Sequence, residues 1–254
     1  GEPNRLSRDV LPYPSIEQAH QATKAIKPGP AAPCPRTHAS GVRDGGIELP
    51  LPASAHERFD DVVRSRRSAH EFAGGAKQMA QAQLATLLEV AYLPLEADFA
   101  SHPDAAESSP SLDLMVFIHR VEGLEPGVYY YEPEQRELHS LRRGDQRRIA
   151  AEVSLGQAIA ATSCVTFAMA AGLNRAWRCY GERGYRYLHF EAGMLGQRLY
   201  VAAEALGLRC TGIGAFFDDE VNRYLALPEG TQVVYQLACG YALQDERLVT
   251  ISAG

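Results

Sequence analysis

The chain has 254 residues, of which 46% are hydrophobic and 22% are charged, as in an ordinary globular protein. Its formal net charge is -6 at pH 7 and its isoelectric point is near 5.8, which argues against the broad basic surface that nucleic acid requires. No apolar run reaches the roughly 18 residues that a membrane span needs. We therefore expect neither a nucleic-acid partner nor a membrane partner.

The cysteines and histidines show no pattern that is typical of a metal site. The five cysteines are widely spaced without a C-x-x-C pair, and the eight histidines include no H-E-x-x-H motif. This spacing predicts no metal site and no disulfide framework. The first residues lack the apolar core of a signal peptide, because Ser7, Arg8 and Asp9 interrupt the only apolar stretch. We expect a cytoplasmic protein with free thiols.

Residues 1–53 are interpreted as an N-terminal arm. Prolines recur throughout this segment and interrupt regular structure repeatedly. One short helix is predicted over residues 15–27, with Ser15 as its N-cap. An arm of this kind either wraps its own domain or crosses to a partner subunit. The compact domain is predicted to span residues 54–254.

The domain is predicted to begin with two helices. A helix capped at Ser54 is expected to present Phe59, Val62 and Val63 on one apolar face. A second helix is predicted over residues 78–92, because its leucines recur at helical spacing.

A polar loop and a series of strands are predicted next. Residues 94–110 are polar and rich in small residues, which favours a loop. Beyond them, short runs of apolar, β-branched and aromatic residues bounded by turn signals predict strands. These runs are residues 112–119, 128–131, 138–141, 161–170, 209–213 and 233–241.

The clearest helix is predicted over residues 185–206. Its apolar residues recur in steps of four and three, and Gly207 stands where a helix-ending glycine belongs. Strands and helices are mixed along the chain without the regular alternation of a doubly wound sheet. The fold class is therefore predicted to be α+β.

Arg66, Arg67 and Ser68 are candidates for binding a phosphate group. Guanidinium donors match phosphate oxygens bidentately, and a neighbouring hydroxyl adds one more donor. The same residues can also form an ordinary solvated helix end, where cations interact favourably with the helix dipole. The local pattern alone leaves both interpretations open.

Gly212 and Gly214 follow a predicted strand. Glycines at such a position let the backbone approach a flat ligand closely. A lone G-x-G is weak support, because most such pairs are simply turns. The stretch is not G-x-G-x-x-G, so it does not predict a dinucleotide-binding fold.

As an ordered set, these segments resemble the nitroreductase superfamily, and they look most like its SagB-type dehydrogenase branch. Residues 66–72 are similar to the family's R-R-S-x-R-x-F segment, and residues 122–133 are similar to its G-L-x-P-G-x-Y-x-Y-x-P hairpin. The glycine pair is followed here, as in the family, by an F-x-D-x-x-V stretch. Further ordered matches are residues 183–187, 191–193, 197, 206–208 and 240.

The resemblance implies a nitroreductase-like α+β fold, with a central, mainly antiparallel sheet flanked by helices and an extended N-terminal arm. It also implies FMN as the cofactor, because the R-R-S segment of the family holds the phosphate and ribityl chain of FMN. His70 stands where the family has a third arginine. The cofactor-binding residues implied for this chain are Arg66, Arg67, Ser68, His70, Gln197, Gly212 and Gly214.

Two segments depart from the family pattern. The azoline oxidases of this branch carry Lys-Tyr ahead of R-G-Y-R-Y, whereas this chain carries Cys179 and Tyr180. The resemblance thus implies Tyr180 as the catalytic acid or base, without the lysine. In the loop before the strand predicted at residues 112–119, residues 104–107 read Asp-Ala-Ala-Glu where the family has P-S-x-G. Two carboxylates close to an anionic cofactor would be unfavourable.

The resemblance implies two functions. The first is an FMN-dependent oxidoreductase that transfers hydride to or from a small molecule or a peptide azoline. The second is a degenerate, non-catalytic homologue that acts as a scaffold or partner subunit in a biosynthetic complex, because fold alone does not fix function. The family resemblance and the arm also predict a homodimer.

Overall fold

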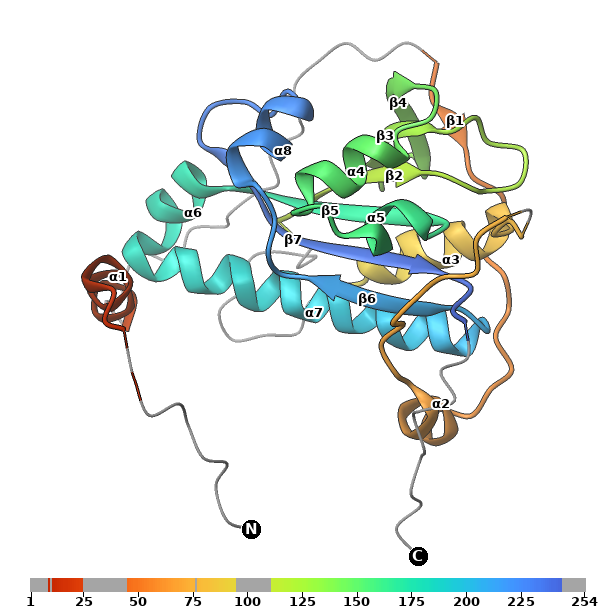
Figure 1. The fold of residues 1–254 in the computed structure, drawn as a ribbon, viewed down its shortest axis with the longest axis horizontal. Helices are drawn as coiled ribbons and strands as arrows, with labels where there is room; N and C mark the ends of the chain where they lie inside the picture. Colours follow the sequence, from red (N-terminus) through yellow and green to blue (C-terminus); the bar gives the residue numbers. More distant parts are fainter. Residues whose placement is uncertain (1–8, 10, 25–44, 76, 95–110, 244–254) are drawn as a thin grey trace, which may run out of the picture.

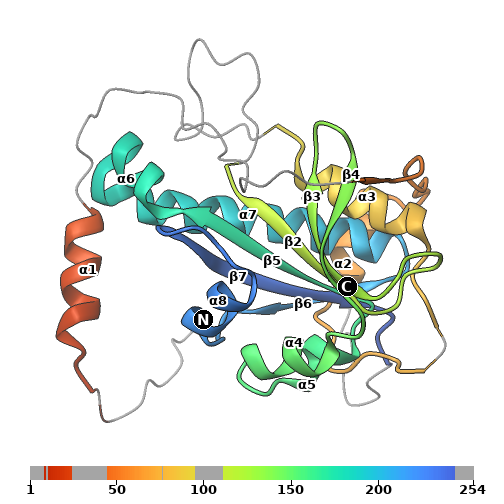
Figure 2. The same ribbon diagram turned by 90° about the horizontal axis from the view of Figure 1, so that it is seen from above.

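A computed structural model describes residues 9, 11–24, 45–75, 77–94 and 111–243. It shows a seven-stranded sheet with helices on both faces (Figures 1 and 2). The strand order is β1-β4-β3-β2-β5-β7-β6, and every neighbouring pair is antiparallel. This confirms the predicted α+β class and the mainly antiparallel sheet.

The strands are β1 (Ile47–Glu48), β2 (Asp113–Ile118), β3 (Gly127–Glu132), β4 (Glu137–Arg143), β5 (Val165–Gly172), β6 (Arg209–Ile213) and β7 (Thr231–Gly240). The helices are α1 (Pro14–Lys24), α2 (Phe59–Ser65), α3 (Gln81–Ala91), α4 (Arg147–Val153), α5 (Ala158–Thr162), α6 (Leu173–Tyr180), the 3-10 turn η1 (Gly181–Arg183), α7 (Gly184–Ala205) and α8 (Asp218–Tyr224).

The central strands are buried on both faces, so their sequences read as continuous apolar runs. In β2, Leu114, Val116 and Ile118 lie in the core between the sheet and helices α3 and α7. The alternate residues Met115 and Phe117 lie in a second core with residues of α4, α5 and α8. Figure 2 shows these two helical layers on opposite sides of the sheet. The sheet therefore separates two cores, as side chains that alternate along a strand require.

Helix α7 is the longest element and ends as predicted. Gly207 has a φ of +70°, and the backbone N–H of Leu208 donates to the Ala203 carbonyl at 2.8 Å, which closes the helix. The Gln83 side chain of α3 donates to the Leu206 carbonyl at 3.1 Å. The C-terminal end of α7 is thus fixed to the beginning of α3.

Three predicted elements differ from the structure. The N-terminal helix begins at Pro14, so Ser15 lies in its first turn rather than at its N-cap. Helix α2 begins at Phe59 rather than at a Ser54 cap, and Phe59 and Val63 are exposed while Val62 is buried. The predicted apolar face was wrong, because this helix of seven residues buries a single side chain in the domain. The strand predicted from residue 161 begins at Val165, because residues 158–162 form α5. The hydroxyls of Ser163 and Thr166 both donate to the carbonyl of Ala160, which stabilises this helix end.

Two elements lie inside the predicted arm. Helix α1 lies across the N-terminal end of α7, apart from the sheet (Figures 1 and 2). Strand β1 pairs with β4 at the sheet edge, and Leu49, directly after it, is buried in the α3–α7 core. The arm boundary at residue 53 stays a prediction. Among the described residues, no helix is both long enough and apolar enough to cross a membrane.

Candidate functional site

The predicted phosphate-binding residues lie where the chain leaves α2 and meets β6. Arg66 ends α2, and its backbone N–H donates to the Val62 carbonyl at 2.9 Å. Ser68 then forms a parallel bridge with Cys210 of β6, and the N–H of Ala69 donates to the Cys210 carbonyl at 3.0 Å. Residues 68 and 69 therefore lie beside β6, the strand that leads to the predicted glycine pair.

The hydroxyl of Tyr200 on α7 joins these two segments. It lies 3.1 Å from the Ser68 hydroxyl and accepts a hydrogen bond from the Gly212 N–H at 2.7 Å. The guanidinium of Arg66 lies over the same ring, 5.2 Å from its centroid. One tyrosine thus holds together three of the residues predicted to bind the cofactor.

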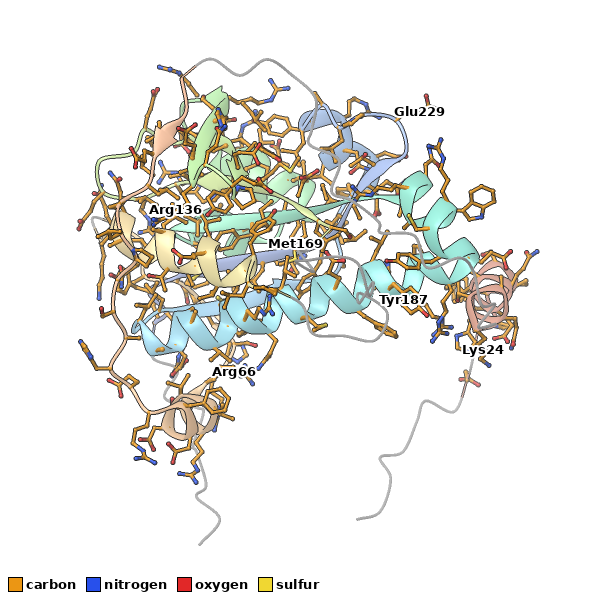
Figure 3. All side chains as sticks on the ribbon, turned by 180° about the vertical axis from the view of Figure 1, so that it is seen from behind. Lys24, Arg66, Arg136, Met169, Tyr187 and Glu229 are labelled. Carbon is orange, nitrogen blue, oxygen red and sulfur yellow. The ribbon has the colours of Figure 1, made fainter. Side chains whose placement is uncertain are left out.

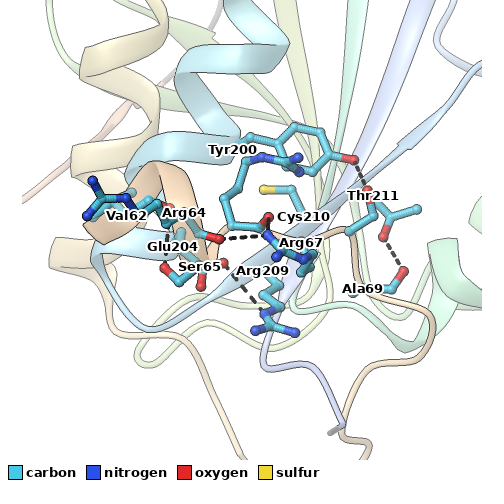
Figure 4. Close-up of polar contacts among 12 residues, drawn as sticks. Val62, Arg64, Ser65, Arg67, Ala69, Tyr200, Glu204, Arg209, Cys210 and Thr211 are labelled. Atoms are coloured by element: carbon cyan, nitrogen blue, oxygen red, sulfur yellow. Dashed lines mark hydrogen bonds and ion pairs between the residues drawn. The ribbon is translucent and has the colours of Figure 1, made fainter. Parts of the chain in front are cut away.

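A group of charged residues surrounds this junction (Figure 4). Arg67 donates to the carbonyls of Arg64 and Arg66 at 2.8 and 2.7 Å, so it caps the last turn of its own helix. Arg209, at the start of β6, lies 3.5 Å from the Glu204 carboxylate of α7. Among the described residues, the guanidinium groups of Arg66, Arg67 and Arg209 share this corner with the carboxylate of Glu204.

Tyr200 and Arg209 were missed by the sequence analysis. Tyr200 does not belong to the apolar series of α7, so the periodicity of the sequence did not indicate that its side chain contacts β6. Arg209 stood at the start of a predicted strand, where charge alone carries no functional meaning. Only the pairing of residues 68–69 with β6 brings the two side chains to the predicted triplet.

The two glycines play different parts. A side chain at Gly212 would meet the hydroxyl of Tyr235, which lies only 1.8 Å from the position of an added Cβ. The Tyr235 ring also lies 3.0 Å from an added Cβ at Gly196 of α7, so both glycines make room for this ring. An added Cβ at Gly214 has no atom of the described residues within 4 Å. Gly212 thus has a packing reason of its own, whereas Gly214 faces open space.

We predict that Gly212→Ala destabilises the protein by about 2 kcal/mol, because the Tyr235 ring must leave a well-packed position. Gly214→Ala is the matched control, and we expect it to change the free energy of unfolding by less than about 0.5 kcal/mol. Urea denaturation followed by circular dichroism measures both variants. Equal stability of the two would show that Tyr235 has room to move.

Two further predicted cofactor ligands lie near this corner. Gln197 is exposed on α7, three residues before Tyr200, and such residues are neighbours on a helix surface. His70 is exposed and directly follows Ala69, whose carbonyl accepts a hydrogen bond from the Thr211 hydroxyl. Gln197 therefore lies next to Tyr200 on α7, and His70 follows the residues that pair with β6; the roles of both side chains stay predictions.

Tyr180 lies at a different place. It ends α6, and its ring meets the ring of Tyr187 edge-on at 5.2 Å. Tyr187 precedes Tyr200 by 13 residues on α7, or about 20 Å at 1.5 Å per residue. The structure therefore does not place Tyr180 beside the Arg66–Ser68 corner. Strand β6 runs from that corner toward the α6 end of the sheet (Figure 1).

Side chains of α7 also form hydrogen bonds with both chain segments that flank residues 95–110. Arg198 donates to the Pro94 carbonyl at 2.7 Å. The buried carboxylate of Glu191 accepts hydrogen bonds from the N–H and hydroxyl of Ser111 and from the N–H of Leu112, the last at 3.0 Å. Burial raises the pKa of Glu191, and these donors together with Arg175 oppose that effect. The predicted Asp-Ala-Ala-Glu segment at 104–107 lies outside the described residues.

The site contains no recognisable metal centre within the described ranges, where no group of three His, Cys, Asp or Glu side chains is arranged to hold an ion. What it offers instead is an arginine-rich corner, a strand with an open glycine at its end and a tyrosine farther along α7. This combination suits an anionic, extended ligand better than a metal ion.

Comparison with known proteins identifies the family. The chain matches the Nitroreductase family over residues 63–241. It belongs to this family. The chain is 33% identical over 187 residues to MJ1384 of Methanocaldococcus jannaschii, a protein assigned by name to the nitroreductases, and the match covers 72% of this chain and 91% of that protein. The family resemblance seen in the sequence is thereby confirmed.

Other proteins match this chain in sequence or in fold. The trifolitoxin operon protein TfxC of Rhizobium leguminosarum is 26% identical over 181 residues, 65% of this chain and 50% of that protein. A crystal structure from Anabaena variabilis, also assigned by name to the nitroreductases, has 32% identity and a TM-score of 0.67 over 78% of this chain and 42% of that one. The chain thus spans half or less of both proteins. The Escherichia coli microcin synthetase McbBCD complex, with 15% identity and a TM-score of 0.59, matches over 94% of this chain and 85% of that one.

Proposed function

We propose that this member of the nitroreductase family is an FMN-dependent oxidoreductase of the SagB-type dehydrogenase kind. The observation that carries the proposal is the corner in which Tyr200 holds Arg66, Ser68 and Gly212 together. The similarity to TfxC, a protein of the trifolitoxin operon, supports the same branch. The substrate class is then a small molecule or a peptide azoline.

The residues of the corner fit FMN on two observations. The guanidinium of Arg66 lies over the Tyr200 ring and the hydroxyl of Ser68 contacts the Tyr200 hydroxyl, and in these positions they can bind a phosphate group. Arg67 and His70 adjoin them in the sequence. Among the described residues, no atom lies within 4 Å of an added Cβ at Gly214, which leaves this backbone accessible to a flat ligand. Gln197 and Gly212 complete the set that would hold the cofactor. When bound, FMN supplies the capacity to accept or donate a hydride equivalent.

The protein's own contribution to the reaction would be orientation and proton transfer. Tyr180 carries a phenol that can hold or release a proton at its oxygen, and it stands in an aromatic contact with Tyr187. Cys179 replaces the lysine of the azoline oxidases, so Tyr180 would work here without that cation. We also propose that the protein is a homodimer, as the family resemblance and the arm predict, and that it is cytoplasmic, as the widely spaced cysteines predict.

A second function is favoured by a separate observation. Arg67 caps its own helix, His70 replaces an arginine, and Cys179 replaces a lysine. These features suit a homologue that binds flavin weakly and serves as a scaffold or partner subunit in a biosynthetic complex. The fold likeness to a chain of the microcin synthetase complex is compatible with such a role. A purified protein that stays colourless during titration with FMN supports this alternative.

Arg66→Ala tests the leading proposal. Because a charge-assisted hydrogen bond is worth about 1.5–3 kcal/mol, we expect the dissociation constant of FMN to rise roughly ten- to a hundredfold. Quenching of FMN fluorescence during titration of the apoprotein measures this constant.

Arg64→Ala is the matched control for this measurement. Arg64 lies two residues earlier on α2, is well exposed and faces Asp60 and Asp61 at 3.6 and 4.0 Å. We expect its removal to leave FMN affinity unchanged. The same affinity in both variants and the wild type would mean that residues 66–68 form only a solvated helix end.

A further inference from the structure

In the described part of the chain, the hydrogen bonds between helix α1 and the rest of the protein come from its C-terminal half, at residues 20–24. Leu11, Tyr13 and Ile16, around its first turns, are between 58% and 72% exposed, and Thr23 is its only buried residue. A helix of 11 residues is marginal by itself in water. The contacts at its C-terminal end therefore decide whether it stays docked in this position.

Two arginines of the α6–α7 connection make these contacts. Arg183, in η1, donates to the carbonyls of Thr23 and Lys24 at 3.1 and 3.4 Å. Arg186, in the first turn of α7, donates to the Thr23 hydroxyl at 2.8 Å and to the His20 carbonyl at 3.1 Å. The last carbonyls of a helix lack partners within the helix and carry the negative end of its dipole. The two guanidinium groups donate hydrogen bonds to these carbonyls and place positive charge at the negative end of the helix dipole.

Arg183 also contacts the aromatic group that contains Tyr180. Its guanidinium lies over the ring of Tyr187, 5.4 Å from the centroid. The ring of Tyr187 meets Tyr180 edge-on, with the ring planes at 90°. Figure 3 labels Tyr187 on α7 and Lys24 at the end of α1, on either side of this connection. A continuous series of contacts therefore leads from the end of α1 to Tyr180.

The connection itself is tight and depends on two glycines. Gly181, directly after Tyr180, has φ +60° and ψ -150°, a conformation that is essentially restricted to glycine. A side chain at Gly184 would lie 2.4 Å from the Ala176 carbonyl of α6. Helices α6 and α7 thus pack closely against each other across the turn that follows Tyr180.

We propose that α1 positions Tyr180, with Arg183 and Tyr187 as the positioning residues that transmit its docking. The proposal rests on the proposed function, because it assigns the arm a part in orienting the phenol that handles the proton. Loss of α1 docking would loosen the end of α6 and misplace Tyr180. The cofactor corner at Arg66, which lies near the other end of α7, would stay unchanged.

The experiment compares three variants of the full chain. Ala19→Pro breaks α1 at an exposed position, because proline removes a backbone donor and clashes with the preceding turn. Arg183→Ala keeps α1 intact and removes the guanidinium that donates to the Thr23 and Lys24 carbonyls. Gln18→Ala, at the neighbouring exposed position of α1, keeps the helix intact and is the matched control.

Two readouts do not depend on flavin or turnover. Trp177, the only tryptophan of the chain, lies on α6 three residues before Tyr180, so its fluorescence anisotropy reports the mobility of this helix end. Hydrogen exchange of residues 178–184 reports the opening of the turn. In Ala19→Pro and Arg183→Ala we expect lower anisotropy and exchange faster by about tenfold or more, with no change in Gln18→Ala.

The kinetic readout then tests the positioning role. We expect kcat to fall by about tenfold or more in the two disrupting variants, while the dissociation constant of FMN changes less than about twofold. Unchanged exchange and anisotropy in Ala19→Pro would overturn the proposal. Faster exchange with unchanged kcat would overturn it as well. A wild-type protein without flavin binding or turnover instead refutes the proposed function, and exchange and anisotropy then decide whether α1 orders the turn.

Discussion

Replacing Glu191 with alanine is expected to destabilise the protein by about 3–5 kcal/mol, because it leaves one buried donor and two part-buried donors without their acceptor. The carboxylate is 7% exposed and accepts from the N–H and hydroxyl of Ser111 and the N–H of Leu112. The Leu112 N–H is buried with its residue at the start of the central strand β2, where water cannot replace the lost acceptor. Urea denaturation at pH 7 measures the loss.

Two variants with smaller expected losses of stability distinguish the contribution of the whole carboxylate from that of a single hydrogen bond. Ser111→Ala removes one donor together with its bond, and we expect a loss of about 1 kcal/mol. Glu191→Gln keeps the volume and one acceptor oxygen, so its stability should lie between the other two. Arg175, which donates to the Ser111 carbonyl at 2.6 Å, stays in place in all three. An alanine variant as stable as the wild type would mean that the chain relaxes and exposes these donors to water.

The long elements of this fold could be predicted from the sequence because their signals are periodic. The apolar series of α7 and the glycine at 207 gave its limits within one residue at each end. The run at residues 112–119 gave β2 in the same way. In both cases burial is regular along the element, so local composition and tertiary packing agree.

The short helices could not be predicted on these grounds. Helix α6 carries apolar residues at helical spacing, namely Leu173, Ala176, Trp177 and Tyr180, but the pattern spans only eight residues, and the helix buries only Ala176 and exposes Trp177. Its limits are set by Gly181 and by packing against Gly184. Helices α4 and α8 have seven residues each, too few for a periodic pattern to stand out.

For the candidate site, the sequence indicated the segments but not what joins them. The triplet at 66–68 and the glycine pair stood about 145 residues apart, and nothing local predicted that they meet. They meet because the chain after Arg67 pairs with β6 and because the hydroxyl of Tyr200 reaches both. The packing role of Gly212 against Tyr235 was equally hidden, since β6 and β7 contribute its two sides.

His119 should make stability depend on pH in the acid range. Burial lowers its pKa from 6.5 to about 4, while the hydrogen bond to the Ala160 carbonyl, at 3.0 Å, and Asp145 act in the opposite direction. With Nε2 donating to that carbonyl, a second proton would have to sit on Nδ1, which is buried without a hydrogen-bond partner among the described residues. The folded protein therefore keeps this imidazole neutral when the unfolded chain has already bound a proton.

The sign follows from the two pKa values. Above pH 6.5 neither state is protonated at this group, and stability is unaffected. As pH falls from 6.5 to about 4, the unfolded state binds more protons, so stability is lost, by about 3 kcal/mol in total at roughly 1.4 kcal/mol per pH unit. Below about pH 4 the contribution is constant. The free energy of unfolding measured by urea denaturation at several pH values between 4 and 7 gives this slope.

His119→Gln isolates the effect from the other titrating groups. The glutamine amide can still donate to the Ala160 carbonyl from the position of Nε2, but it does not titrate. The variant should be less stable at pH 7, because its side chain fills the site less well. Between pH 4 and 6.5, its free energy of unfolding should fall less steeply with falling pH than that of the wild type, by up to roughly 1.4 kcal/mol per pH unit, which corresponds to one proton. Parallel slopes would contradict the argument, since they would require that the buried imidazole accept its proton as readily as an exposed one.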